Sequence, residues 1–175
     1  KKVLVPDLEA GCSLADSCPA DAFEAFTKAH PDHTVISYVN TTAAVKALTD
    51  VVVTSTNAKK IVDQFPKDAK LIFGPDRNLG NYINSVTGRE MLLWDGACHV
   101  HEQFSVEKLV KLKAEHPEAE VLAHPECKRP LLLMADFIGS TQALLNYTIN
   151  SDKKSFLVAT ESGIIHEMKK KNPDK

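Results

Sequence analysis

The sequence predicts an α/β protein built from repeated three-layer αβα units with short parallel sheets. Short apolar segments alternate with segments whose apolar residues recur every three to four positions, which is typical of βαβ units. The second half of the chain also repeats the first at a shift of 86 residues, from Cys12 to Cys98 (98 − 12 = 86). Such self-similarity indicates a duplicated unit. With 175 residues, 43% of them hydrophobic, the chain can bury a sizeable core.

The predicted strands are short and rich in Val, Ile, Leu or Phe, as strands buried on both faces are. In chain order they cover residues 3–5, 34–39, 50–54, 70–73, 90–94, 120–123, 137–139 and 155–159. Helices are predicted over residues 21–29 and 106–115 from their apolar spacing, the second with Ser105 as its N-cap. Residues 74–80 resemble a phosphate loop, but their turn-forming composition favours a structural turn leading into a helix that contains Tyr82.

The repeat aligns the two halves without a gap. Besides the two cysteines, the matched pairs are His30-Pro31-Asp32 with His116-Pro117-Glu118, Val35 with Val121, Asp50 with Asp136, Thr54-Ser55 with Ser140-Thr141, and Leu71-Ile72 with Leu157-Val158. We interpret residues 1–9 as the end of a truncated first subdomain, 10–85 as a second subdomain and 86–175 as a third. We therefore expect the chain to be an excerpt of a longer protein.

Candidate site residues follow the strands, because open α/β sheets bind ligands beyond the carboxyl ends of their strands. One duplicated strand end carries Tyr38, Val39 and Asn40, and its counterpart carries His124, Pro125 and Glu126. His124 and Glu126 face the same side of a strand, so they form a candidate acid–base pair. An ordinary strand-end histidine bonded to backbone is an equal alternative.

A second pair of strand ends carries the hydroxyl residues Ser55, Ser140 and Thr141. Where a helix follows, its first N–H groups can hold a phosphate or carboxylate beside such hydroxyls. The alternative is that Ser55 and Thr141 only cap their helices. Duplication at matched strand ends makes the two interpretations about equal.

The cysteines favour metal chemistry over disulfides, since four in a chain of this length do not form a disulfide scaffold. Cys12 and Cys98 occupy equivalent small-residue turns, and thiolates from repeated units suit zinc or an iron–sulfur cluster. Two buried structural thiols are the alternative. Cys18 and Cys127 have no repeat partner and are not expected to be ligands. His99 and His101 flank Cys98, either to tune a cluster or as surface residues.

Charge and hydropathy exclude several classes of partner. The formal net charge is −2 (21 − 23), which argues against nucleic-acid or membrane-surface binding. No apolar run approaches the roughly 18 residues of a membrane span, and no signal-peptide pattern is present. A reducing, cytoplasmic location is expected.

At seven places the sequence resembles the bacterial quinolinate synthase family, in the family's order. These are residues 6–16 (PDLEAGCSLAD), 38–40 (YVN), 74–80 (GPDRNLG), 96–101 (GACHVH), 124–126 (HPE), 139–141 (GST) and 159–163 (ATESG). The resemblance implies three similar αβα subdomains around a pseudo-threefold axis. It also implies a [4Fe–4S] cluster held by three cysteines, of which Cys12 and Cys98 are two and the third lies outside this chain.

The implied reaction condenses iminosuccinate (iminoaspartate) with dihydroxyacetone phosphate to give quinolinate, phosphate and water in NAD biosynthesis, with the cluster as Lewis acid. The resemblance assigns catalytic roles to Glu126, His124 and Tyr38. It assigns substrate binding to Tyr38, Val39, Asn40, Ser55, His124, Pro125, Glu126, Ser140 and Thr141. The expected partners are the two substrates and the aspartate-oxidising enzyme that supplies iminosuccinate.

Two rival functions and an inactive fragment remain as alternatives. A zinc hydrolase using His124, Glu126 and Cys127 is disfavoured, because the neighbours Glu126 and Cys127 point to opposite faces of a strand. The second rival function is that of a non-catalytic module that binds small anions through Ser55 and Thr141. Because the implied third cysteine and an N-terminal substrate-binding segment lie outside these residues, an inactive fragment is also an alternative.

Overall fold

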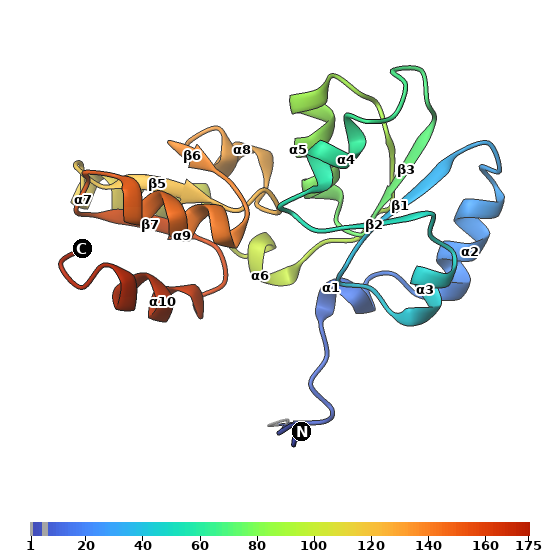
Figure 1. Ribbon diagram of the computed structural model, residues 1–175. Helices are drawn as coiled ribbons and strands as arrows, with labels where there is room; N and C mark the ends of the chain where they lie inside the picture. The colour runs from blue at the N-terminus through green and yellow to red at the C-terminus, as the bar shows by residue number, and fades with distance from the viewer. Residues whose placement is uncertain (1, 5–6) are drawn as a thin grey trace.

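The computed structural model describes residues 2–4 and 7–175 and shows an α/β chain with two parallel sheets in these residues (Figure 1). The first half contains α1 (Ser13–Asp16), α2 (Ala20–Lys28), β1 (Thr34–Tyr38), α3 (Ala43–Ala47), β2 (Val51–Val53), α4 (Ala58–Val62), β3 (Leu71–Gly74), α5 (Arg77–Thr87) and β4 (Leu92–Leu93). The second half contains α6 (His99–Glu102), α7 (Val106–Glu115), β5 (Glu120–Ala123), α8 (Arg129–Leu132), β6 (Phe137–Ile138), α9 (Thr141–Asn150), β7 (Phe156–Ala159) and α10 (Ile164–Lys171).

The first sheet has the strand order β2-β1-β3-β4 and is covered by helices on both faces. Alternate residues of a strand point to opposite faces. Ile36 therefore packs with Leu79 of α5 and Val62 of α4, whereas its neighbour Val35 packs on the other face with Phe23 of α2. This alternation of two apolar faces explains why the predicted strands read as continuous apolar runs.

The second sheet has the order β6-β5-β7 and the same three layers. Val121 packs with Leu109 of α7 and Leu131 of α8. Leu122 packs on the opposite face with Leu144 of α9 and with Met168 of α10. The predicted α/β class with short parallel sheets is therefore confirmed.

In both sheets, the first two strands along the chain pair in the same register. Ile36 pairs with Val51 in the first sheet, and Leu122 pairs with Phe137 in the second, so both partners are 86 residues further on. The loop carboxylates repeat as well: Asp50 accepts the N–H of Val35 at 2.8 Å, and Asp136 accepts that of Val121 at 2.8 Å. The repeat in sequence is thus also a repeat in hydrogen bonding.

The third strand corrects the prediction of a repeat without gaps. Thr34 pairs with Leu71, whereas its counterpart Glu120 pairs with Phe156, a shift of 85 (156 − 71). A shift of one residue along a strand turns every side chain to the opposite face of the sheet, so the offset decides which face each residue of β7 occupies. Phe156 packs on the face of Leu122, as the repeat requires, whereas Leu157 lies on the opposite face.

The remaining strand predictions overlap the observed strands, with one exception at the N-terminus. Val3 and Leu4 belong to no strand and are each 81% exposed, so the prediction for residues 3–5 is wrong at these two positions. Val5 and Pro6 lie outside the described residues. The strand expected at 90–94 forms as β4, but it pairs with β3 in the first sheet. The boundary predicted at residues 85 and 86 therefore divides that sheet, and a division that keeps it whole falls after Leu93.

Candidate functional site

The carboxyl ends of β1 and β5 bring polar side chains from both halves of the chain together. Tyr38 ends β1 and is buried, with 8% of its surface exposed. Its side chain interacts with Ser55, which follows β2, and with Glu126 from the second half. Glu126 and His124 follow β5 and are each only 3% exposed. Three of the predicted strand ends therefore meet in one buried polar group.

Glu126 is the centre of this group. Its Oε2 lies 3.0 Å from Nδ1 of His101, and its Oε1 lies 3.8 Å from Nδ1 of His124. The two imidazole rings stack on each other, with centroids 4.8 Å apart and planes 23° apart. Nε2 of His101 lies 3.2 Å from the hydroxyl oxygen of Thr160, beyond the end of β7. The ring of His101 is thus held between Glu126 and Thr160.

The pKa values of the two histidines are shifted in opposite directions. Burial alone would lower the pKa of His101, but the adjacent Cys98 and Glu126 raise it to about 9. Burial lowers the pKa of His124 to about 4, with Glu126 opposing the shift and charged His101 adding to it. Burial also opposes ionisation of Glu126, but the adjacent His101 keeps the pKa of Glu126 below the usual range. At neutral pH the group therefore holds a charged His101–Glu126 pair beside a neutral His124.

The two predicted cluster cysteines occupy equivalent positions in the structure. Cys12 is the N-cap of α1 and Cys98 is the N-cap of α6, two helices of four residues each. The next residues, Ser13 and His99, are hydrogen-bonded to each other, so the two turns lie side by side. Nδ2 of Asn40 lies 3.9 Å from the sulfur of Cys12. Ligand atoms of Cys98, His101 and Glu126 all lie within 4.8 Å of one another.

The thiols of Cys12 and Cys98 are chemically suited to hold a metal cofactor. Both are free, Cys12 is exposed and Cys98 is half-buried, so a metal can reach them. The other two thiols do not fit, because burial raises the pKa values of Cys18 and Cys127 to about 12 and keeps them protonated. Cys127 also donates to the carbonyl oxygen of Ala159 at 3.4 Å. The accessible thiols, together with the cluster of Cys98, His101 and Glu126, are therefore compatible with a metal cofactor.

The hydroxyl residues divide into different environments. Ser140 is the N-cap of α9 and accepts the N–H of Ala143 at 3.3 Å, so capping explains it. Thr141 is exposed at the first position of α9. Ser55 is not a cap, because α4 begins at Ala58 with Asn57 before it. Of the other predicted residues, Pro125 is buried and Val39 is 40% exposed.

Sequence reasoning missed the central position of His101, which is only 6% exposed. A signal was available, since His101 follows Cys98 by three residues and such residues share one face of a helix. Thr160 and Asp76 were also missed as contacts of the site. Asp76 is fully buried, and its carboxylate accepts the N–H of Cys98 at 2.8 Å.

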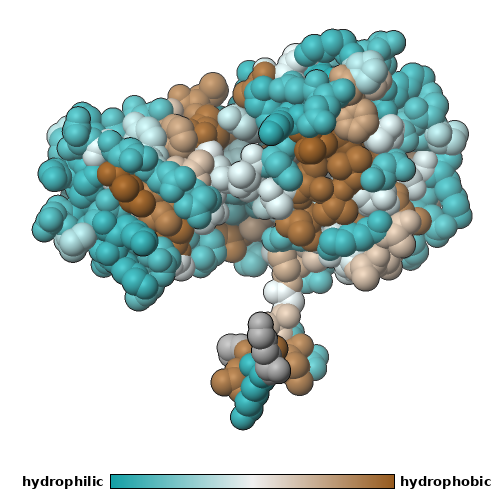
Figure 2. Space-filling model, in the orientation of Figure 1, coloured by the Kyte–Doolittle hydropathy of each residue, from teal (hydrophilic) through white to brown (hydrophobic). Residues whose placement is uncertain are grey.

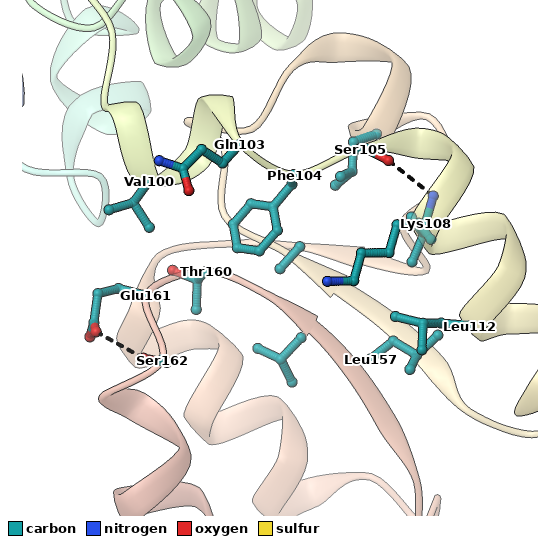
Figure 3. A pocket seen from close by; sticks show the side chains of 14 residues that line it. Val100, Gln103, Phe104, Ser105, Lys108, Leu112, Leu157, Thr160, Glu161 and Ser162 are labelled. Atoms are coloured by element: carbon teal, nitrogen blue, oxygen red, sulfur yellow. Dashed lines mark hydrogen bonds between the residues drawn. The ribbon is translucent and has the colours of Figure 1, made fainter.

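A cavity lies beside the polar group rather than over it. It has a volume of about 530 Å³ and runs between α7 and β7 (Figure 3). Phe104, Leu112 and Leu157 make much of it apolar, and Thr160 lies at the end toward His101. None of the predicted site residues lines it. In the first sheet the equivalent edge of β3 is covered by β4.

The surface seen in Figure 2 is mostly hydrophilic, with apolar side chains gathered in separate patches. Among the described residues, no helix combines the length and the apolar character needed to cross a membrane.

Fold and site together define a duplicated α/β protein with a polar, thiol-containing site where strands of both sheets end. A family model described as "Quinolinate synthetase A protein" matches residues 1–175. Quinolinate synthases from Synechocystis sp., Chloroherpeton thalassium and Synechococcus sp. are 61%, 60% and 59% identical over the whole chain. The chain belongs to the quinolinate synthase family. It covers 55%, 54% and 55% of these relatives, about half of their length.

Proposed function

We propose that this chain is part of a quinolinate synthase that condenses iminosuccinate with dihydroxyacetone phosphate. The products are quinolinate, phosphate and water, and the reaction belongs to NAD biosynthesis. The names of the relatives support this proposal. The observation that carries it is the buried Glu126, which contacts Tyr38, His101 and His124 within reach of Cys98.

Cys12 and Cys98 would hold two corners of a [4Fe–4S] cluster, with the third cysteine supplied from outside this chain. Thiolates are the protein ligands of such clusters, and the exposed Cys12 and half-buried Cys98 are accessible to one. When bound, the cluster supplies a Lewis acid at an iron without a protein ligand.

Glu126 is the proposed proton carrier. Its carboxylate is ionised, and its Oε2 lies 3.0 Å from Nδ1 of His101, a distance within reach for proton transfer. Nδ1 of His124 lies 3.4 Å from the Glu126 N–H and accepts it, which leaves Nε2 of His124 to carry the ring proton. His124 would then act as a neutral hydrogen-bond donor to substrate.

The substrate charges fit the donors around this group. Iminosuccinate is a dicarboxylate, and neutral His124, the Asn40 amide and the Ser55 hydroxyl can donate to carboxylate or phosphate oxygens. Tyr38 stays a phenol, because burial and Glu126 raise its pKa above the usual range. A neutral tyrosine in contact with Ser55 and Glu126 is suited to orient substrate rather than to supply charge.

The proposal extends to location and supply. Iminosuccinate is hydrolysed easily because it is an imine, so an aspartate-oxidising enzyme in the same compartment is the proposed source. We place both enzymes in the cytoplasm.

Anaerobic purification of the full-length protein tests the function. We expect iron and sulfide in the purified protein, and quinolinate when both substrates are added. A protein with zinc and no iron would support a hydrolase. A metal-free protein that binds phosphate but forms no quinolinate would support the anion-binding module.

A further inference from the structure

We propose that Asp76 is a positioning residue for the cluster, because its carboxylate holds the backbone of Cys98 in place. This inference rests on the proposed function, in which Cys98 is a cluster ligand. It gives a role to residues 74–80, whose glycine- and proline-rich sequence looks like a phosphate loop.

The two oxygens of Asp76 have different partners. Oδ1 accepts the N–H of Leu79 at 2.8 Å and so caps α5. Oδ2 accepts the N–H of Cys98 at 2.8 Å, across 22 residues of sequence. The side chain is completely buried. One carboxylate therefore joins the start of α5 to the cysteine turn.

Capping alone does not require a buried carboxylate. In α3 and α7 a single hydroxyl, from Thr42 or Ser105, performs the same task. Burying an aspartate is costly unless both oxygens are hydrogen-bonded. The second oxygen is used for Cys98, which is the reason that an acid occupies this position.

The neighbours of Asp76 hold the same turn from other sides. The N–H of Arg77 donates to the carbonyl oxygen of Gly96 at 2.8 Å, two residues before Cys98. Nη2 of Arg77 lies 3.4 Å from Glu102, and Nδ2 of Asn78 donates to Glu102 at 2.7 Å. Glu102 is the last residue of α6, the helix that Cys98 caps. The start of α5 thus holds both ends of the segment that carries Cys98 and His101.

The turn also packs against the segment that follows the other cysteine. A Cβ on Gly96 would lie 2.5 Å from Oγ of Ser17, just beyond α1. The indole N–H of Trp94 donates to the carbonyl oxygen of Ser17 at 2.9 Å. A displacement of the Cys98 turn would therefore disturb the packing beside α1, which Cys12 caps.

Asp76→Ser is the sharpest test, because serine keeps a cap for α5 but is too short to reach Cys98 as well. Asp76→Asn keeps the shape but places an amide group against the N–H of Cys98. The matched control is Asp136→Asn, which weakens a similar carboxylate bond, to the N–H of Val121, away from the site. All variants are made in the full-length protein.

The first readout needs no cluster. In cluster-free protein, the Cys98 amide should exchange with solvent roughly tenfold faster in Asp76→Ser, the effect of losing a hydrogen bond to a charged group. In reconstituted protein, the rate of iron loss should rise roughly tenfold, the usual scale for the outer partners of metal ligands. The electron paramagnetic resonance spectrum of the reduced cluster should change as well. The control Asp136→Asn should match the wild type in amide exchange, in the rate of iron loss and in this spectrum.

Wild-type exchange at Cys98 together with wild-type iron retention and spectrum in Asp76→Ser would overturn the inference while leaving the proposed function intact. An iron-free wild-type protein would instead refute the proposed function, and the amide exchange would still test the contact between Asp76 and Cys98.

Discussion

Ser13 and His99 are hydrogen-bonded to each other although 86 residues separate them. The same shift relates the first two strands of one sheet to those of the other, so these two residues occupy equivalent positions in the repeat. Equivalent residues of two copies can touch only close to the axis that relates the copies. Because Ser13 follows Cys12 and His99 follows Cys98, both thiols lie near that axis, where the proposed cluster would be shared by the repeated units.

We expect Cys12→Ala and Cys98→Ala to abolish iron loading of the full-length protein, and Cys127→Ser to retain it. Cys12 and Cys98 are accessible at the two turns, whereas Cys127 is buried with its pKa raised to about 12. Iron and sulfide assays on anaerobic preparations measure the difference. A complete cluster in Cys98→Ala would refute the ligand assignment.

We expect Glu126→Gln to lower turnover by roughly 10²-fold or more, the usual scale of acid–base catalysis. Glutamine keeps the shape but cannot accept a proton from His101, which lies 3.0 Å from the carboxylate. Turnover and iron content are measured on the same preparation, so that loss of the cluster is recognised. Near-native turnover with a full cluster would reduce Glu126 to a residue that only positions its neighbours.

Ser140→Ala and Thr141→Ala should affect different properties. Ser140 caps α9, so its removal should cost about 1 kcal/mol of unfolding free energy, as loss of a cap does. The exposed Thr141 should contribute within about 0.5 kcal/mol to stability. Because the family resemblance assigns Thr141 to substrate binding, its loss should raise KM more than it lowers kcat. Urea denaturation and steady-state kinetics on both variants decide. Equal losses of stability would show that Thr141 has a structural role.

The stability of the protein should fall in mild acid because of His124. Burial holds its pKa at about 4, below the ordinary 6.5. Between these pH values the unfolded chain binds a proton that the folded chain does not, so unfolding becomes more favourable as the pH falls from about 6.5 to 4. Urea denaturation over this range should show a shallower pH dependence for His124→Asn than for the wild type.

His166→Asn is the control for this measurement, since His166 is exposed on α10. This substitution should leave the pH dependence of the unfolding free energy unchanged. An unchanged slope in His124→Asn would mean that other groups cause the acid sensitivity. His101, with its pKa raised to about 9, contributes in a different window: its stabilisation is complete below about 6.5 and is lost as the pH rises through 9.

The sequence by itself determined the fold class, most strands and the duplication. These depend on local apolar patterns, and a buried parallel strand such as β1 reads as an apolar run wherever it lies in the chain. The same patterns placed Tyr38, His124 and Glu126 at strand ends. The family followed from motifs that are contiguous in sequence, such as residues 96–101 and 124–126.

Only the tertiary structure decided which of these side chains meet. His101 contacts Glu126 across 25 residues (126 − 101), and Asp76 holds Cys98 across 22, because helix packing brings α5 and α6 to the ends of the strands. The offset of one residue in β7 and the pairing of β4 with β3 likewise depend on the register between strands. Register is a property of two segments packed together, so neither segment alone encodes it.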